Sequence, residues 1–362
     1  MTFTFGKDFK LHVYGESHGE SIGVVVEGVP PGILIDTSMI QQELDKRRPG
    51  SGHLVSSRSE KDQVTIRSGV FKGKSTGAPI TMTIPNTDVD SSSYEEIRHI
   101  PRPGHADYTA RVKYSEYNDY RGGGVFSGRM TAAFVMAGAI AKQVLDEHGI
   151  KVLAHVVQVG KVRMEKEVSS EDIRRNVYQN PIRCADIDSV SEMKAEVEQA
   201  KAEGDSVGGI VECRILGVPA GFGEPLFDSV ESVISHAIFS IPGVKGIEFG
   251  SGFGGSLKRG SENNDSPVID DGGIQWSKND SGGVLGGITN GAPIVFRVAF
   301  KPTPSISKVQ STVDLEKMEE TSIQITGRHD PSIVPRAVPV VEGLAAAVMV
   351  DLMKRNASQI HH

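Results

Sequence analysis

Two long segments that are apolar on almost every side constrain the fold of this chain more than any other feature. One runs from 129 to 148 and stops at Gly149, and the other runs from 336 to 356. A helix that is apolar all round is buried in a protein core or in a membrane. The most apolar stretches, 131–141 and 343–353, are shorter than the ~18 residues that a membrane span needs. We therefore expect two helices buried inside a globular domain.

Strand candidates in both halves of the chain are expected to cover this helical layer. They lie at 22–27, 63–68, 79–84, 151–162, 208–217 and 292–300. Further helices are expected at 37–47, capped by Thr37, at 191–203, and from a capping box at 228–231 to residue 239. Several strands are separated only by turns, which disfavours parallel βαβ units. No linker divides the chain, so residues 1–362 are predicted to form one domain with a short disordered tail.

Two regions are expected to lack regular structure. Residues 101–128 are rich in turn-forming residues and include Arg121-Gly122-Gly123-Gly124, while residues 246–291 contain thirteen glycines. Clustered glycines let the backbone approach a ligand closely, and long irregular stretches in compact proteins are usually functional or mobile. Both regions are therefore candidate ligand loops.

Charge and cysteine content argue against several classes of protein. The net charge is −7 at pH 7, whereas a broad nucleic-acid-binding surface would be basic. Cys184 and Cys213 are the only cysteines, and without a CxxC spacing they predict neither a zinc site nor a disulfide framework. The first 20 residues lack the apolar core of a signal peptide. We expect a cytoplasmic protein without a bound metal, a nucleic-acid partner or a membrane contact.

Two histidines stand in glycine-flanked segments that have neither helical nor strand periodicity. His18 lies in Gly15-Glu16-Ser17-His18-Gly19, and His105 lies in Arg102-Pro103-Gly104-His105-Ala106-Asp107-Tyr108. Histidine exchanges protons near neutral pH, so two of them on such loops suggest proton transfer. The alternative for either histidine alone is a hydrogen-bonded structural residue.

Arginines gather in the same kinds of loops. Arg58, Arg102, Arg121 and Arg129 each adjoin Gly, Ser or Pro, and Arg47 and Arg48 end the helix expected at 37–47. Because arginine binds carboxylate and phosphate groups in bidentate fashion, these residues suggest a substrate with several anionic groups. Surface salt bridges are the alternative, and Arg47 and Arg48 also suit a solvated helix C-terminus.

Four other segments could bind anions or move protons. Ser127-Gly128-Arg129 opens the first apolar helix, whose N-terminus suits a phosphate or carboxylate. The glycine-rich stretch 282–291 could form an anion nest or receive a flat ring system, and Lys301-Pro302-Thr303-Pro304-Ser305 offers an ammonium group and hydroxyls. Asp330 could be a base, although an Asx turn before Pro331 is the favoured interpretation of that residue alone.

Together these segments closely resemble the chorismate synthase family. The matching motifs occur in order over nearly the whole chain: Gly15 to Gly19, Arg47-Arg48-Pro49-Gly50, Arg102 to Tyr108, Arg121 to Gly124, Ser127-Gly128-Arg129, 282–291, and Arg328-His329-Asp330-Pro331. The resemblance implies an α+β fold, a β-α-β sandwich with a helical layer between antiparallel sheets, and a homotetramer. It also implies the anti-1,4-elimination of phosphate from 5-enolpyruvylshikimate 3-phosphate to give chorismate, the last step of the shikimate pathway.

The resemblance further implies a requirement for reduced FMN, although the reaction is redox-neutral overall, and it associates NADP with the protein. We expect no reductase domain within residues 1–362, so the reduced flavin would come from an external reductant. The catalytic residues would be His18, which protonates the leaving phosphate, His105, which protonates or orients the flavin, and Asp330, which helps proton removal through flavin N5.

The binding residues are implied in the same way. Substrate would contact Ser17, Arg47, Arg48, His53, Arg102, Arg129 and Arg328. The cofactor would contact Arg58, His105, Ser127, Gly128, Arg129, Gly286, Gly287, Asn290, Lys301, Thr303, Ser305 and Arg328.

The chain departs from the family pattern in two places. His53 stands where many relatives have a second arginine, so that loop would carry a positive charge only when the imidazole is protonated. Val125-Phe126 stands where relatives often have Arg-Ser. Two other classes of function compete with the lyase: a flavin-binding sensor without turnover, which would not need the arginines, and a module that binds an anionic polymer, which the net charge disfavours.

Overall fold

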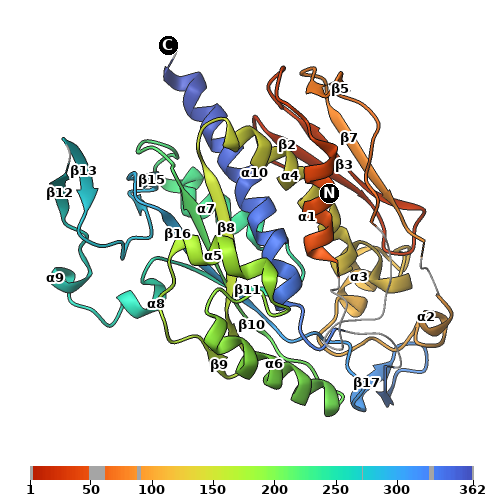
Figure 1. Ribbon diagram of the computed structural model, residues 1–362. Helices are drawn as coiled ribbons and strands as arrows, with labels where there is room; N and C mark the ends of the chain where they lie inside the picture. The colour runs from red at the N-terminus through yellow and green to blue at the C-terminus, as the bar shows by residue number, and fades with distance from the viewer. Residues whose placement is uncertain (1–2, 49–61, 88–90, 271, 326–329, 361–362) are drawn as a thin grey trace.

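Two antiparallel sheets enclose a layer of helices (Figure 1). The computed structural model describes residues 3–48, 62–87, 91–270, 272–325 and 330–360. The first sheet has the order β1 (Thr4–Phe5), β2 (Lys10–Gly15), β3 (Ser21–Glu27), β7 (Ile80–Pro85) and β4 (Thr65–Ile66). The second has the order β11 (Val244–Phe249), β16 (Ile294–Phe300), β10 (Gly209–Leu216), β8 (Lys151–Val159) and β9 (Val162–Arg163).

The helices between the sheets are α1 (Thr37–Arg47), α4 (Thr131–Asp146), α7 (Val230–Ile238) and α10 (Val334–Ile360). Helix α4 packs on β3 of the first sheet, and α10 packs on β8 and β10 of the second. The predicted α+β sandwich with its buried helical layer is therefore confirmed. Helices α5 (Ser170–Asn176) and α6 (Ile187–Ala202) also contact β8.

Helices α4 and α10 approach each other most closely at a pair of glycines. A Cβ atom built on Gly138 would lie only 2.1 Å from the Cα atom of Gly343. Both residues lie inside apolar helices, so glycine serves here for contact between backbones rather than for a turn. The two glycines thus allow these core helices to pack backbone against backbone.

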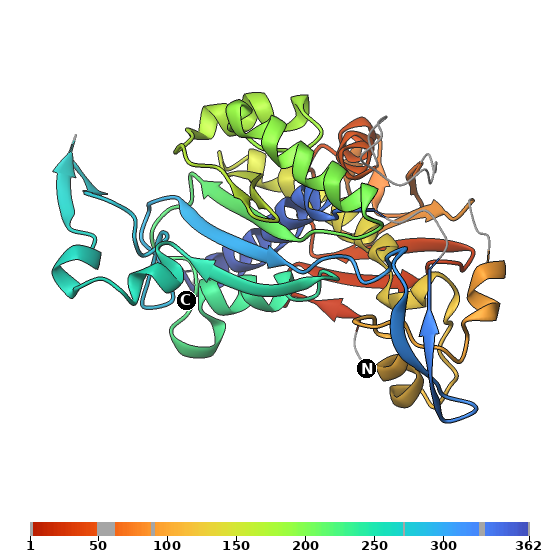
Figure 2. The ribbon, with the colours of Figure 1, turned by 90° about the horizontal axis from the view of Figure 1, so that it is seen from below.

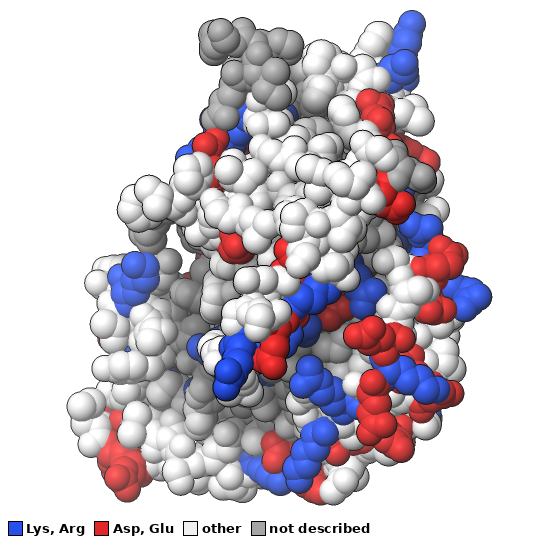
Figure 3. Space-filling view, turned by 90° about the vertical axis from the view of Figure 1, so that its left-hand side faces the viewer, with Lys and Arg blue, Asp and Glu red and all other residues white. Residues whose placement is uncertain are grey.

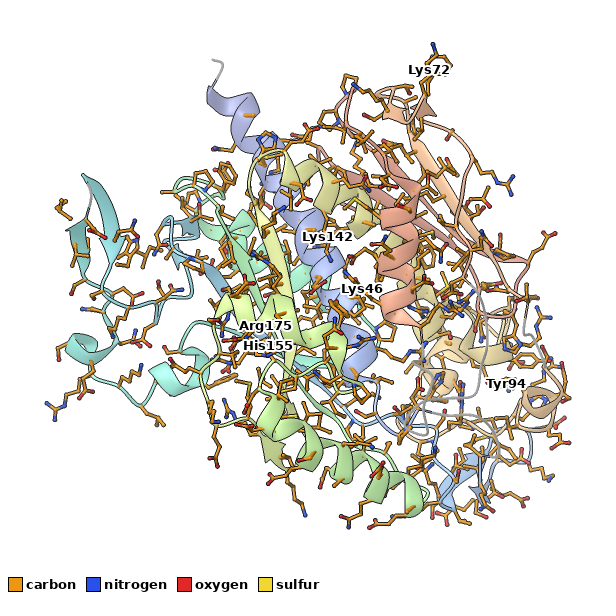
Figure 4. The ribbon with its side chains drawn as sticks, in the orientation of Figure 1. Lys46, Lys72, Tyr94, Lys142, His155 and Arg175 are labelled. Carbon is orange, nitrogen blue, oxygen red and sulfur yellow. The ribbon has the colours of Figure 1, made fainter. Side chains whose placement is uncertain are left out.

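A network of charged side chains is buried in the same layer. The Lys142 Nζ atom lies 2.6 Å from a carboxylate oxygen of Glu43 on α1 and 2.6 Å from one of Glu342 on α10. Tyr178 donates a hydrogen bond of 3.1 Å to Glu342, and Lys46 makes a second ion pair with Glu43. Figure 4 labels Lys46 and Lys142 close to each other between α1 and α10. The network joins three helices by charge as well as by apolar contact.

Several helix boundaries differ from those expected. Asp36, not Thr37, is the N-cap of α1, because its carboxylate accepts a hydrogen bond from the Ser38 amide. Helix α4 begins at Thr131 because residues 128–130 form a 3₁₀ turn. Ser229, not Asp228, caps α7. Helix α6 begins at 187 rather than 191, and the strand expected at 151–162 turns at 160–161 between β8 and β9.

The two regions expected to be irregular contain regular structure. The first includes α3 (Asp107–Lys113) and the 3₁₀ segments η1 (Arg121–Phe126) and η2 (Gly128–Met130). The second includes β11, the short helices α8 (Gly252–Gly255) and α9 (Gly260–Asn263), and the hairpins β12 (Pro267–Asp270) with β13 (Gly273–Trp276) and β14 (Val284–Leu285) with β15 (Ile288–Thr289). The glycines allow turns between these short elements, so the expectation that both regions lack regular structure was wrong.

The remaining elements lie around this body. They are the hairpins β5 (Val70–Phe71) with β6 (Lys74–Ser75) and β17 (Gln310–Asp314) with β18 (Glu319–Ile323), the helix α2 (Ser92–Glu96), and the 3₁₀ segments η3 (Val177–Gln179) and η4 (Leu226–Asp228). The segment from α8 to β13 projects far from the sandwich (Figure 2). None of the helices in the described part of the chain combines the length and apolarity of a membrane span.

Candidate active site

The two predicted histidine loops meet on either side of the glycine turn in η1. His18 lies in the turn between β2 and β3, and His105 lies just before α3. A Cβ atom at Gly122 would lie 2.5 Å from His18 Nε2, and one at Gly123 would lie 3.3 Å from His105 Nε2. Both glycines have positive φ, +58° and +82°. The turn therefore requires glycine twice, for its backbone conformation and for its contact with the imidazole rings.

Surrounding side chains orient the His18 ring. Its Nδ1 atom lies 2.8 Å from the Ser91 hydroxyl, and its ring meets that of Tyr94 edge to face with centroids 5.3 Å apart. Tyr94 belongs to α2, at the edge of the molecule labelled in Figure 4. The neighbouring Ser17 is fully buried, and no partner within the described residues hydrogen-bonds to its hydroxyl. An unsatisfied buried hydroxyl beside an oriented imidazole suits a site that receives a polar ligand.

His105 belongs to a compact charged group. Its Nδ1 atom lies 2.6 Å from an Asp107 carboxylate oxygen, and the Nε atom of Arg102 donates to the other oxygen at 2.7 Å. Burial alone would raise the pKa of Asp107, but hydrogen bonds from Arg102 and His105 hold that pKa well below its ordinary value. The ionised carboxylate favours a proton on Nδ1, so in the neutral ring Nε2 would be the acceptor, and Arg102 Nη2 lies 3.3 Å from it.

The segment after β16 packs against the His105 loop. The Lys301 ammonium contacts the Gly104 carbonyl, and Ser305 accepts a hydrogen bond of 3.2 Å from Arg102. The Thr303 hydroxyl is buried and has no hydrogen-bond partner among the described residues. Burial and the nearby charge of Lys245 lower the pKa of Lys301. A cation and two hydroxyls therefore adjoin the His105 loop, a donor set that suits a phosphate group.

Arg47 and Arg129 meet at a residue that the sequence did not single out. Asp62 pairs with Arg129 Nη1 through one oxygen and with Arg47 Nη1 at 3.4 Å through the other. Ser127 caps the 3₁₀ turn by accepting from the Arg129 amide, and the Gly128 carbonyl accepts from Arg47 at 2.8 Å. The single signal for Asp62 in the sequence was a carboxylate directly before the strand expected at 63–68.

Asp330 and Arg48 have different partners near the end of α1. Asp330 pairs with Arg336, which also donates to the Arg47 carbonyl at 3.2 Å, so Asp330 lies close to the buried arginines. Arg48 instead pairs with Asp45 at 3.2 Å on its own helix and is one-third exposed. Arg121 likewise pairs with its neighbour Asp119.

The glycine-rich stretch 282–291 lies elsewhere. Thr289 of its hairpin hydrogen-bonds to Phe222, and the Gly287 carbonyl accepts from Val230. Figures 1 and 2 place β15 at the end of the molecule away from α2 and α3. The structure thus does not bring Gly286, Gly287 and Asn290 together with the histidine loops within one chain. His53, Arg58 and Arg328 fall outside the described residues.

Comparison with known proteins identifies the family. The sequence model of the family described as chorismate synthase matches residues 9–353. Chorismate synthase of Korarchaeum cryptofilum is 53% identical over 352 residues, which cover 97% of each chain. That of Methanosarcina mazei is 50% identical, covering 97% of this chain and 96% of the relative.

A solved structure gives the same answer for the fold. A crystal structure of chorismate synthase matches with a TM-score of 0.77 at 29% identity, covering 98% of this chain and 97% of the other. The family model, the relatives and the solved structure thus all indicate chorismate synthase over nearly the full length of the chain. The chain belongs to the chorismate synthase family, as its motifs predicted, and is a carbon–oxygen lyase.

Proposed function

We propose that the loops carrying His18 and His105 form the active site of the chorismate synthase reaction. In this reaction 5-enolpyruvylshikimate 3-phosphate loses phosphate and a hydrogen by anti-1,4-elimination to give chorismate, the last step of the shikimate pathway. The observation that carries the proposal is the meeting of both histidines at the Gly122-Gly123 turn, next to the buried hydroxyl of Ser17. An elimination of phosphate requires a proton donor for the leaving group, and the site provides oriented imidazoles.

His18 is the proposed general acid for the leaving phosphate. Ser91 and Tyr94 fix its ring, and Ser17 supplies a hydroxyl without a described partner beside it. An imidazolium at this position would hydrogen-bond to a phosphate oxygen and neutralise charge as the C–O bond breaks. Ser17 would hold a second oxygen of the same group.

The substrate carries two carboxylates and a phosphate, and arginines are proposed to bind them. Arg47, Arg102 and Arg129 are all buried at the site, between 4% and 6% exposed. Their hydrogen bonds to protein acceptors hold the guanidinium groups in place before substrate binds, which reduces the entropy lost on binding. Arg48, His53 and Arg328 remain proposed substrate contacts, and Asp330 remains a proposed proton acceptor.

Residues next to His105 suit the proposed cofactor, reduced FMN. Lys301, Thr303 and Ser305 would hold its phosphate, a role that the buried Thr303 hydroxyl without a described partner supports. Reduced FMN, when bound, would supply the electron-rich environment that the redox-neutral elimination needs. His105, held by Asp107, would keep or move a proton at Nε2.

The other proposed cofactor contacts are Arg58, Ser127, Gly128, Arg129, Gly286, Gly287, Asn290 and Arg328. Ser127 and Gly128 adjoin the buried Arg47 and Arg129, whereas the hairpin bearing Gly286 lies at the other end of the molecule.

Phosphate release tests the proposal directly. Purified protein receives 5-enolpyruvylshikimate 3-phosphate and photoreduced FMN under anaerobic conditions, and inorganic phosphate and chorismate are measured. Replacement of a general acid or base typically costs ~10²–10⁴-fold in rate. We expect losses in that range for His18→Ala and His105→Ala, with native circular dichroism. His148→Ala, at an exposed histidine after α4, is the matched control and should keep full activity. Wild-type turnover in both site variants would contradict the assignment, and the absence of any phosphate release from the wild-type protein would contradict the function.

The proposal includes a cytoplasmic homotetramer that receives reduced flavin from an external reductant. The projecting segment supports self-association, because apolar side chains on it are exposed: Phe253 81%, Leu257 89%, Ile269 80% and Ile274 66%. Apolar exposure of this kind marks interaction surfaces. On the face that Figure 3 shows, basic and acidic side chains are interspersed. Light scattering of the purified protein should give the mass of four chains, and a monomer would refute the tetramer.

A further inference from the structure

Asp62 is more deeply buried than a lone carboxylate would be. Its side chain is 2% exposed, and its backbone φ of +44° is a conformation that residues other than glycine rarely adopt. Each carboxylate oxygen faces a different arginine, Arg47 on one side and Arg129 on the other. A rare backbone conformation that places a buried side chain between two charged partners is typical of a functional site.

The charges around Arg47 show what Asp62 contributes. Arg129 and Arg336 repel the Arg47 guanidinium, whereas Asp62 and Asp330 attract it. Burial and repulsion by Arg336 lower the pKa of Arg47 to about 9, because the two carboxylates offset these effects only in part. Without Asp62, three guanidinium groups would face a single carboxylate among the described residues of this group. Asp62 is therefore the counter-charge that allows Arg47 and Arg129 to lie close together.

A chain of hydrogen bonds leads from Asp62 to the His18 loop. Arg129, held by Asp62, donates through Nε to the Asn86 side-chain oxygen at 3.1 Å. The Asn86 amide nitrogen donates to the Glu16 and Gly19 carbonyls at 2.9 and 2.7 Å. These two carbonyls bracket Ser17 and His18, so the position of Arg129 is coupled to that of the proposed general acid.

We propose that Asp62 is a positioning residue of the active site: its carboxylate fixes the spacing of the Arg47 and Arg129 guanidinium groups and, through Asn86, the loop that carries His18. Asp62 itself does not touch the reacting atoms. The inference rests on the proposed function, because it assigns Asp62 a role in the same site.

Four variants test the role, each assayed for kcat and KM with reduced FMN. Asp62→Ala removes the carboxylate and leaves space, whereas Asp62→Asn removes the charge but fills the space. Misplacement of catalytic groups by about 1 Å can cost ~10²-fold, so we expect kcat/KM to fall about that much in both. Added sodium formate should restore Asp62→Ala at least tenfold, because formate can occupy the vacated carboxylate position, but should not restore Asp62→Asn. Asp188→Asn, at an aspartate whose side chain is 74% exposed, is the control and should match wild type with and without formate.

The fourth variant covers a failure of folding. Asp62→Glu keeps the charge and moves the carboxylate by one methylene group, so it should fold and still lose about tenfold in kcat/KM. Wild-type kcat/KM in Asp62→Glu, or a folded Asp62→Ala that formate leaves equally impaired, would overturn the positioning role. Because wild-type turnover is measured in the same series, a failure of the proposed function is distinguishable: the wild-type protein would then release no phosphate.

Discussion

Removal of the buried Lys142 ammonium should destabilise the helical layer. In wild type this group lies between Glu43 and Glu342, whose side chains are 13% and 4% exposed. Lys142→Met has similar length and leaves both carboxylates in place. Glu43 keeps Lys46 as a partner, whereas within the described part of the chain Glu342 keeps only hydrogen bonds, from Tyr178 and the Ala154 amide. The main cost is therefore one buried carboxylate without its cation.

The magnitude follows from this count. Breaking a buried ion pair by removing one partner costs about 3–5 kcal/mol, and the remaining hydrogen bonds to Glu342 place this case at about 3 kcal/mol. The effect should depend on pH. Burial tends to raise the pKa of Glu43, but Lys142 and Lys46 hold it below its ordinary value. A lowered pKa stabilises the folded state above the unfolded value of ~4.3, and that contribution is lost as pH falls. The difference between wild type and variant should thus stay near its full size from pH 7 down to about pH 4.3 and shrink as pH falls further towards about pH 3.

Urea unfolding followed by far-UV circular dichroism measures the effect at both pH values. Lys142→Met with Glu342→Gln should recover part of the loss, because the double variant leaves no unpaired charge at Glu342. Lys166→Met, at an exposed lysine paired with Asp188, is the matched control and should unfold like wild type. A Lys142→Met protein as stable as wild type at pH 7, or one with the same deficit at about pH 3, would refute this account of the network.

Two further predictions concern the buried interior. Gly138→Ala should lower the free energy of unfolding in urea by about 1–3 kcal/mol or more, because its methyl group would overlap Gly343. The control is Gly254→Ala, whose added methyl group would have no neighbour within 4 Å and should leave the stability unchanged. Equal effects of the two substitutions would contradict the close crossing of the helices. Cys184 and Cys213 should react with a thiol reagent only after unfolding, because burial raises the pKa of Cys184 to about 11 and that of Cys213 well above its ordinary value. Rapid labelling of the native protein would contradict this prediction, because it would show that the thiols are accessible.

The site could be predicted from sequence only in part. The motifs pointed to His18 and His105, but their meeting at Gly122-Gly123 depends on a turn more than a hundred residues from the first histidine. Asp62 was missed because one aspartate before a strand is unremarkable until the fold brings two arginines to it. The stretch at 282–291 forms a hairpin that the fold places away from the histidines of the same chain, so its role in cofactor binding stays a prediction.

By itself, the sequence determined those helices and strands whose buried residues recur at regular intervals along the chain. The apolar segments that became α4 and α10 had to be buried, and the short strand candidates separated by turns favoured antiparallel sheets around them. Only the tertiary structure decided which charges share a carboxylate, which glycines touch, and which loops meet. Periodicity records whether a residue is buried, because burial constrains every turn of a helix or every second residue of a strand. A contact such as that between Asp62 and Arg129 joins residues distant in sequence and leaves no local pattern.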